Sequence, residues 1–294
     1  IIFLNIMILR ETAKTLFNQN KHTFAPGNRD YLMEKKEVTN LEKWMKDSVK
    51  RDILEASGFI VNNKIVPPSY SINSSGFRCK EFNKKSTGIV TLGCSDTFGQ
   101  YQYLEKTWSS ILGSYLNQEV WNLSNPGGDI GSNYISLLKH SKSIKYDKIF
   151  ILIPSPYREL YLKKIEGKKS GFTTRHPLGE DDKYYRQLVK HYIVNKDTFK
   201  EIFYFNVDTF QNNLNRMFYI NSYLDAINGI ARKNNAKIYF VPNITYYQKN
   251  TVKEPYFVKQ LKARHAPDLA CDLKHFGKTY QKIIANYFIK MLRN

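Results

Sequence analysis

The feature that most constrains this 294-residue chain is a series of short apolar runs, rich in β-branched residues and separated by segments of helix length. Such runs are typical of strands buried on both faces, and connections of helix length favour parallel pairing with right-handed crossovers. The pattern therefore predicts an α/β fold, a doubly wound three-layer α/β/α sandwich around a mostly parallel sheet. The expected strands are residues 88–93, 119–124, 148–154 and 236–243.

Helical segments are expected between and after these strands. They cover residues 103–117, a segment that ends near residue 140, residues 208–234 and residues 277–292. In sheets of this kind ligands bind beyond the carboxyl ends of the strands. The residues that directly follow each strand are therefore the first candidates for a functional site.

The first 70 residues have a different pattern, and we interpret them as an N-terminal helical extension to a main domain of residues 71–294. Residues 40–57 are typical of an amphipathic helix with Asn40 at its N-cap. Within the main domain, residues 155–200 are irregular, aromatic and charged. An insertion of this length after a strand is well placed to form a lid or rim over a site.

The formal net charge of +19 would attract polyanions such as nucleic acid. The chain has no run of five or six like charges, however, and its basic residues are mostly scattered lysines. We interpret the charge as a solvated basic surface, so that any association with nucleic acid is non-specific and sensitive to salt.

The cysteines and the chain ends indicate no disulfide framework and no membrane span. Cys79, Cys94 and Cys271 show neither a CxxC pair nor a zinc spacing, and we interpret them as reduced thiols, which favours a reducing compartment. The apolar residues 1–9 are too short to span a bilayer and lack the features of an intact signal peptide. We therefore expect a soluble or peripheral protein without a transmembrane segment.

A serine directly follows the first expected strand, in the segment GCSDTFG at residues 93–99. At such a strand-to-helix turn, the Ser95 hydroxyl is exposed and its backbone N–H lies at the start of the helix. A serine in this position is a candidate nucleophile if a base lies nearby. The alternative is a serine that only caps the helix, with Thr97 filling the turn.

The segment DLKH, before the last expected helix, supplies a candidate base and a candidate acid. Asp272 and His275 are three residues apart, so their side chains project the same way from a turn or a helix start. The carboxylate could then orient the imidazole toward Ser95. A capping aspartate and a surface histidine are the alternative interpretation.

Four segments, in this order, resemble the SGNH/GDSL hydrolase superfamily, and within it the branch with NSxGFR and GCSxTxG segments. They are SINSSGFRCKEF (71–82), GIVTLGCSDTFG (88–99), VWNLSNPGG (120–128) and CDLKHFG (271–277). The resemblance covers roughly residues 71–290. It implies a flavodoxin-like sheet of about five parallel strands and hydrolysis of an ester, usually an O-acyl group, without a metal or other cofactor.

The same resemblance implies a role for each matching residue. Ser95 would be the nucleophile, His275 the general base and then acid, and Asp272 its orienting partner. The backbone N–H groups of Ser95 and Gly127 would form the oxyanion hole. The expected reaction is removal of an acyl group, such as acetyl, from a carbohydrate or similar small molecule through an acyl-enzyme.

One block departs from the family pattern. After the third expected strand the family presents an Asn that donates to the oxyanion, whereas residues 153–159 here are IPSPYRE. Pro156 has no donor, and loss of one oxyanion donor costs about 10²–10³ in rate. We expect Arg158, or else Ser155 or Asn125, to replace it. The alternative is a catalytically impaired SGNH-fold protein that binds or scaffolds, with a protein partner docked on the N-terminal extension.

Other polar residues are weaker candidates for a catalytic or binding role. Asp96 and Asp129 lie near the expected site, and we interpret both as helix caps. The remaining histidines show no metal-ligand spacing, and the glycine pair at residues 127–128 lacks the lysine of a phosphate-binding loop.

Overall fold

The computed structural model describes residues 27–29, 45–66, 68–154, 159–165, 168–175 and 213–242, together with residues 268, 270, 275 and 277–293. Its centre is a sheet of four parallel strands in the order β10-β7-β5-β6. The strands are β5 (Gly88–Leu92), β6 (Glu119–Asn122), β7 (Tyr146–Ile153) and β10 (Lys237–Pro242). Each lies where an apolar run predicts it, and the spatial order is that of a flavodoxin-like sheet. The described residues contain four of the about five strands expected.

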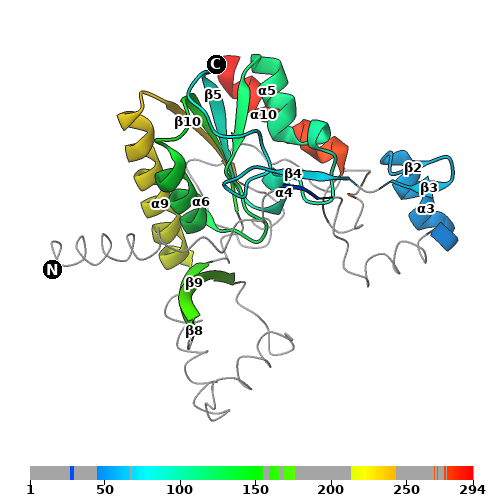
Figure 1. Cartoon of the computed structure of the whole chain (residues 1–294), viewed down its shortest axis with the longest axis horizontal. Coiled ribbons are helices and arrows are strands. Elements are labelled where there is room, and N and C mark those ends of the chain that lie inside the picture. The colour runs from blue at the N-terminus through cyan, green and yellow to red at the C-terminus, as the bar shows by residue number, and fades with distance from the viewer. Residues whose placement is uncertain are drawn as a thin grey trace, which may run out of the picture.

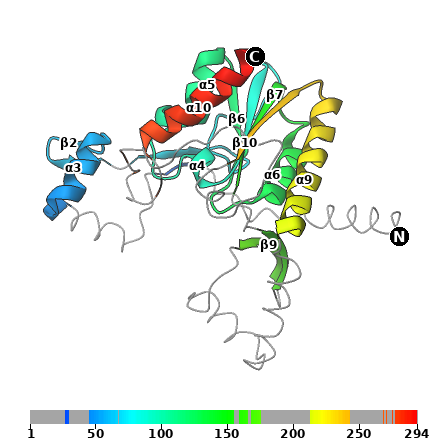
Figure 2. The same cartoon turned by 180° about the vertical axis from the view of Figure 1, so that it is seen from behind.

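Helices cover both faces of this sheet, as Figures 1 and 2 show. On one face lie α6 (Ile130–His140) and α9 (Asn213–Lys233). On the other lie α5 (Trp108–Leu116) and α10 (Lys278–Arg293). The predicted three-layer α/β/α sandwich is therefore confirmed.

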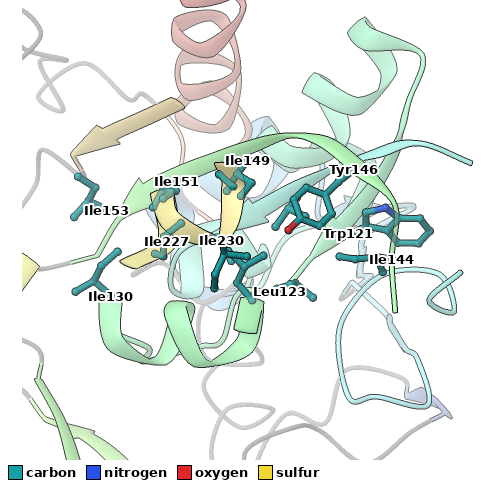
Figure 3. Packing of buried hydrophobic residues seen from close by; sticks show 14 of the residues in the cluster. Trp121, Leu123, Ile130, Ile144, Tyr146, Ile149, Ile151, Ile153, Ile227 and Ile230 are labelled. Carbon is teal, nitrogen blue, oxygen red and sulfur yellow. The ribbon is translucent and has the colours of Figure 1, made fainter. Parts of the chain in front are cut away.

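The alternation of side chains along each strand creates a separate core on each face. Ile149, Ile151 and Ile153 of β7 lie in the core against α6 and α9, and Figure 3 shows them beside residues of these helices. Phe150 and Leu152, between them in sequence, lie in the core against α5 and α10. Full burial of such a side chain contributes about 1.5–3 kcal/mol. This is why β7 is the most continuous apolar run in the chain.

The helix expected over residues 103–117 is divided in two by Thr107. A 3-10 helix, η1 (Leu104–Lys106), precedes α5 (Trp108–Leu116), so the predicted helical segment is present but contains two helices. Thr107 has an extended backbone, with ψ 148°, and its side chain accepts a hydrogen bond from the backbone N–H of Ser110. This capping bond starts α5 afresh at Trp108.

The helical segment predicted over residues 40–57 is interrupted at Asp47, with Met45 and Lys46 helical before it and a separate helix after it. Helix α3 spans Ser48–Ala56, because Asp47 is extended and its side chain accepts a hydrogen bond from the backbone N–H of Lys50. Asp47 is thus the N-cap of α3, whereas Asn40, the N-cap predicted from the sequence, lies outside the described residues. A short hairpin of β2 (Ile60–Val61) and β3 (Lys64–Ile65) follows α3.

The N-terminal segments contact the rest of the molecule through strand pairing, ring stacking and hydrogen bonds. Strand β1 (Gly27–Arg29) pairs with β4 (Tyr70–Ile72), which spans the predicted boundary at residue 70. Phe59 stacks on Tyr103 with ring centroids 5.3 Å apart. The unit formed by α3, β2 and β3 therefore lies against the loop that joins α4 (Ser95–Phe98) to α5.

Part of the expected irregular insertion is a regular hairpin. Strands β8 (Glu159–Ile165) and β9 (Lys168–Arg175) pair in antiparallel fashion, which corrects the prediction over these residues. Figure 1 shows the hairpin beyond the lower ends of α6 and α9. Its role as a lid or rim stays a prediction.

Candidate functional site

Ser95 lies directly past the carboxyl end of the central strand β5, as the first residue of α4. Only 6% of its surface is exposed, so the residue is buried at a turn where the sequence predicts an exposed serine. Its carbonyl oxygen accepts a hydrogen bond from the backbone N–H of Gln100 at 2.9 Å. As the first residue of a helix, Ser95 has a backbone N–H without a carbonyl partner inside that helix. Such an N–H is suited to an oxyanion.

The structure contradicts the alternative that Ser95 only caps the helix. The N-cap position belongs to Cys94, whose side chain makes no capping hydrogen bond. The part of that alternative that concerns Thr97 is correct, because its fully buried side chain fills the turn. A Cβ built on Gly93 would lie 2.0 Å from Thr97 Oγ1, so this position needs a glycine.

Two buried asparagines hold the serine turn from outside. Asn133, on α6, accepts a hydrogen bond from the backbone N–H of Gly93 at 3.1 Å. Asn122, at the end of β6, donates to the carbonyl oxygen of Thr97 at 2.9 Å. Analysis of the sequence missed both, because nothing distinguishes them from ordinary polar residues near a strand or a helix.

Arg78, in the NSSGFR segment, clamps the chain that leaves α4. Its guanidinium is buried and lies over the ring of Tyr70, 4.2 Å from the centroid. Burial lowers the pKa of Arg78 to about 10, although the charges of Tyr70 and Glu105 oppose this shift. The guanidinium donates to the carbonyl oxygens of Ser69, Phe98, Gly99 and Gln102. The arginine of the NSSGFR segment thus has a physical role, which is to fix the turn that follows the candidate nucleophile.

His275 lies just before α10, and its imidazole stacks on the ring of Tyr101. The two ring centroids are 5.4 Å apart, and the planes differ by 30°. Tyr101 follows α4 closely in sequence, so the predicted base and the predicted nucleophile come from segments that meet.

Gln281, in the first turn of α10, ties this helix to the serine turn. It is buried, and its side-chain amide donates to the carbonyl oxygen of Asp96, 185 positions away, at 3.2 Å. Its oxygen accepts from the backbone N–H of Trp108, at the start of α5, at 2.8 Å. Three elements that begin at the carboxyl edge of the sheet are thereby joined by one side chain.

An unexpected carboxylate, Asp268, organises the start of α10. It is buried, and its two oxygens accept from the backbone N–H of Thr279 at 3.1 and 3.2 Å. Its carbonyl oxygen accepts from Gly277, where a Cβ would lie 2.6 Å from the Asp268 carboxyl carbon. Asp272, the acid predicted from the sequence, lies outside the described residues.

Gly127 occupies an exposed turn between β6 and α6, with φ at 73°. The backbone N–H of Gly128 closes this turn on the carbonyl oxygen of Asn125 at 2.9 Å. Because β6 runs parallel to its neighbour β5, this turn lies at the same edge of the sheet as Ser95. The Asn125 amide donates to Ser136 Oγ at 3.2 Å, so it is engaged by α6. Ser155 and Arg158, the other replacement donors, lie outside the described residues.

Of the two aspartates predicted to cap helices, Asp129 does so and Asp96 does not. Asp129 caps α6, and its carboxylate accepts from the backbone N–H of Ser132 at 2.8 Å and from the Tyr219 hydroxyl at 2.5 Å. Burial raises the pKa of Asp129, and these hydrogen bonds oppose the shift. Asp96 is the second residue of α4 and not its cap, so that interpretation was wrong.

The remaining features suggest no second chemistry among the described residues. Cys79 and Cys94 form no disulfide there, and burial raises the pKa of Cys79 to about 12. The described residues contain no group of three or more His, Cys, Asp or Glu side chains that could hold a metal ion. Their helices are all too short or too polar to cross a bilayer.

A cavity of about 450 Å³ lies between α5 and the edge strand β6. Neither Ser95 nor His275 lines it, so it does not coincide with the chemistry expected from the sequence. Its wall includes Arg78, Lys80, Ser110, Glu119 and Asn122.

The described fold therefore defines a three-layer α/β protein with a parallel sheet whose carboxyl edge carries the candidate site. No known family model matches the chain, and no curated protein matches it. One solved structure that does match is a provisionally assigned lipolytic protein of the G-D-S-L family from Desulfitobacterium hafniense DCB-2. The match covers 68% of this chain and 97% of that chain, with 15% identity and a TM-score of 0.28.

Proposed function

We propose that this chain is a serine hydrolase of SGNH type that cleaves an ester bond. Ser95 is the nucleophile, His275 the general base and then acid, and Asp272 the carboxylate that orients it. The oxyanion is stabilised by the backbone N–H groups of Ser95 and Gly127, with Arg158 in place of the usual asparagine.

The observation that carries the proposal is the stack of His275 on Tyr101, beside the turn that begins with Ser95. Segments far apart in sequence meet at the carboxyl edge of the sheet, where α/β proteins bind their ligands. The hydrogen bond from Gln281 to the carbonyl oxygen of Asp96 supports the same encounter. An imidazole near a serine that follows a buried strand is the arrangement that nucleophilic catalysis needs.

The reaction proceeds in two acyl-transfer steps. Ser95 Oγ attacks the ester carbonyl carbon while the His275 imidazole takes the hydroxyl proton, and the oxyanion accepts hydrogen bonds from the two backbone N–H groups. His275 returns the proton to the leaving alcohol, and the acyl group remains as an ester on Ser95. Water, deprotonated by the same imidazole, then releases the carboxylic acid and restores the serine.

The substrate we infer carries a small O-acyl group, such as acetyl, on a carbohydrate or similar alcohol. Because only 6% of the Ser95 surface is exposed, a small acyl group reaches the hydroxyl more easily than a long chain does. The basic surface favours an anionic carrier of that group over a cationic one.

A second candidate function is binding or scaffolding by a catalytically impaired member of the same fold. It is favoured by the sequence after the third strand, where residues 153–159 (IPSPYRE) lack the asparagine of the family pattern. In that case the N-terminal extension is the surface for a protein partner.

Labelling with a fluorophosphonate probe separates the two functions. The wild-type protein is expected to be labelled on Ser95, identified by mass spectrometry, and to hydrolyse p-nitrophenyl acetate. Ser95→Ala removes the nucleophile, so labelling should vanish and turnover should fall by about 10³-fold or more. Ser86→Ala, an exposed serine away from the site, is the matched control and should leave both unchanged. Wild-type protein that is neither labelled nor active would favour the impaired binder.

A further inference from the structure

Tyr101 has a backbone conformation that a tyrosine rarely adopts. Its φ of 62° lies in the left-handed region, where the Cβ of an L-residue crowds the neighbouring carbonyl oxygen. Such strain persists only where the surrounding structure enforces it, and it is concentrated at functional sites.

The surroundings of Tyr101 do enforce this conformation. Its backbone N–H donates to the Tyr70 hydroxyl at 2.6 Å. The guanidinium of Arg78 lies over the Tyr70 ring and donates to the carbonyl oxygens of Gly99 and Gln102, on either side of Tyr101. The turn is therefore held at its backbone from both sides, independently of the Tyr101 ring.

The strained turn places the Tyr101 ring against the His275 imidazole. The ring packs against the apolar cluster around Leu54 and Phe59 in the N-terminal unit, and it also stacks on the His275 imidazole. It is thus supported by a folded segment while it contacts the candidate base. Tyr103, two residues on, joins the same cluster and stacks on Phe59.

We propose that Tyr101 is a positioning residue for His275, an inference that rests on the proposed hydrolase function. The stacked ring fixes the plane of the imidazole, and its π face stabilises the imidazolium that forms when Ser95 loses its proton. Because this stabilisation is gained after substrate has bound, its loss lowers kcat and leaves KM nearly unchanged.

Three substitutions distinguish positioning from simple packing. Tyr101→Phe keeps the ring and should retain at least half of the wild-type kcat. Tyr101→Leu keeps apolar bulk but no π face, and kcat should fall by about 3- to 10-fold at constant KM. Tyr101→Gly relieves the backbone strain but removes the ring, so kcat should fall at least as far even where the folded fraction equals that of wild type.

Tyr103→Leu is the matched control. It removes an aromatic ring from the same cluster, together with its stack on Phe59, and it should reduce thermal stability but not the kcat of the folded enzyme. If Tyr101→Leu and Tyr101→Gly turn over at the wild-type rate when folded, or if Tyr103→Leu loses as much kcat as they do, the proposed role of Tyr101 is wrong.

The NMR signal of the His275 ring tests the inference separately from catalysis. The ring current of Tyr101 should shift this signal in wild type and in Tyr101→Phe, and the shift should disappear in Tyr101→Leu, with His275→Gln providing the assignment. If wild-type protein shows these ring-current shifts but has no turnover, the proposed function is wrong while the contact between Tyr101 and His275 is supported. The same signal in all three proteins overturns the contact and with it the inference.

Discussion

Individual contacts hold the turn that carries Ser95, and each involves a buried polar group. Asn133 accepts from the backbone N–H of Gly93, and Asn122 donates to the carbonyl oxygen of Thr97. A buried polar atom that loses its partner costs about 1–3 kcal/mol. The geometry of the turn therefore depends on residues that do not take part in the reaction.

Gly93→Ala tests this dependence directly. The added Cβ would lie 2.0 Å from Thr97 Oγ1 and 3.0 Å from the carbonyl oxygen of Leu152, so the turn must shift. We expect a loss of about 1–3 kcal/mol in the free energy of unfolding, measured with urea, and a loss of Ser95 labelling. Gly229→Ala in α9 is the matched control, since its Cβ meets nothing within 4 Å. That change should stabilise the protein by about 0.5–1 kcal/mol.

His140, at the end of α6, should make stability depend on pH. It is 9% exposed and lies against the rings of Phe77 and Phe82, and burial lowers its pKa from 6.5 to about 4. Between these values the unfolded chain binds more protons than the folded one, so acidification destabilises the fold. We expect wild type to lose about 2 kcal/mol more than His140→Phe between pH 6.5 and 4.5 in urea unfolding. An equal loss in both proteins would assign the pH dependence to other groups.

At the scale of elements, the first turn of α10 connects the segments that form the candidate site. Gln281 reaches the backbone of α4 and that of α5 at once, while Asp268 caps the helix that carries it. Movement of α10 away from α4 and α5 would break the two bonds of Gln281. The predicted base, which precedes α10, is thereby tied to the predicted nucleophile, which precedes α5.

Gln281→Leu should remove the hydrogen bonds that connect α10 to α4 and α5, without creating a large cavity. The backbone N–H of Trp108 and the carbonyl oxygen of Asp96 lose their partner, which should cost about 1–3 kcal/mol in the free energy of unfolding. The rate of Ser95 labelling should fall more than that of an exposed control, Lys282→Ala, in the same helix turn. Unchanged labelling in Gln281→Leu would show that α10 does not set the geometry of the site.

At the scale of the whole molecule, the sheet could be predicted and the encounters at its edge could not. Burial on both faces leaves a signal in the sequence, because Ile149 and Phe150 are both apolar although they point into different cores. Helices α3 and α5 begin inside the predicted helical segments because Asp47 and Thr107 cap the chain there. A tyrosine gives no sign in the sequence that its backbone is left-handed. The turn at Tyr101, and the stacking of its ring on His275, could therefore not be predicted from the sequence. The hairpin at residues 159–175 was missed because its many lysines hide the alternation of a strand.

The unit of α3, β2 and β3 should open before the sheet does. Leu54 and Phe59 are the two buried residues of its apolar cluster, too few to compare with the cores on either side of β7. Phe59→Ala removes a fully buried ring and its stack on Tyr103, which costs about 3–5 kcal/mol. Because this loss is confined to a small cluster, it should exceed what holds the unit closed, and the rest of the fold should remain intact.

Hydrogen exchange read by mass spectrometry tests this difference. In Phe59→Ala we expect fast exchange over residues 48–66 and faster exchange over residues 100–106, which the unit contacts, with β5 and β7 as protected as in wild type. Val61→Ala, at a position 52% exposed, should change neither region. Equal loss of protection in the unit and in β7 would mean that the two unfold together. In that case the unit is part of one cooperative domain with the sheet, and the support it gives to the loop beside His275 is as stable as the core itself.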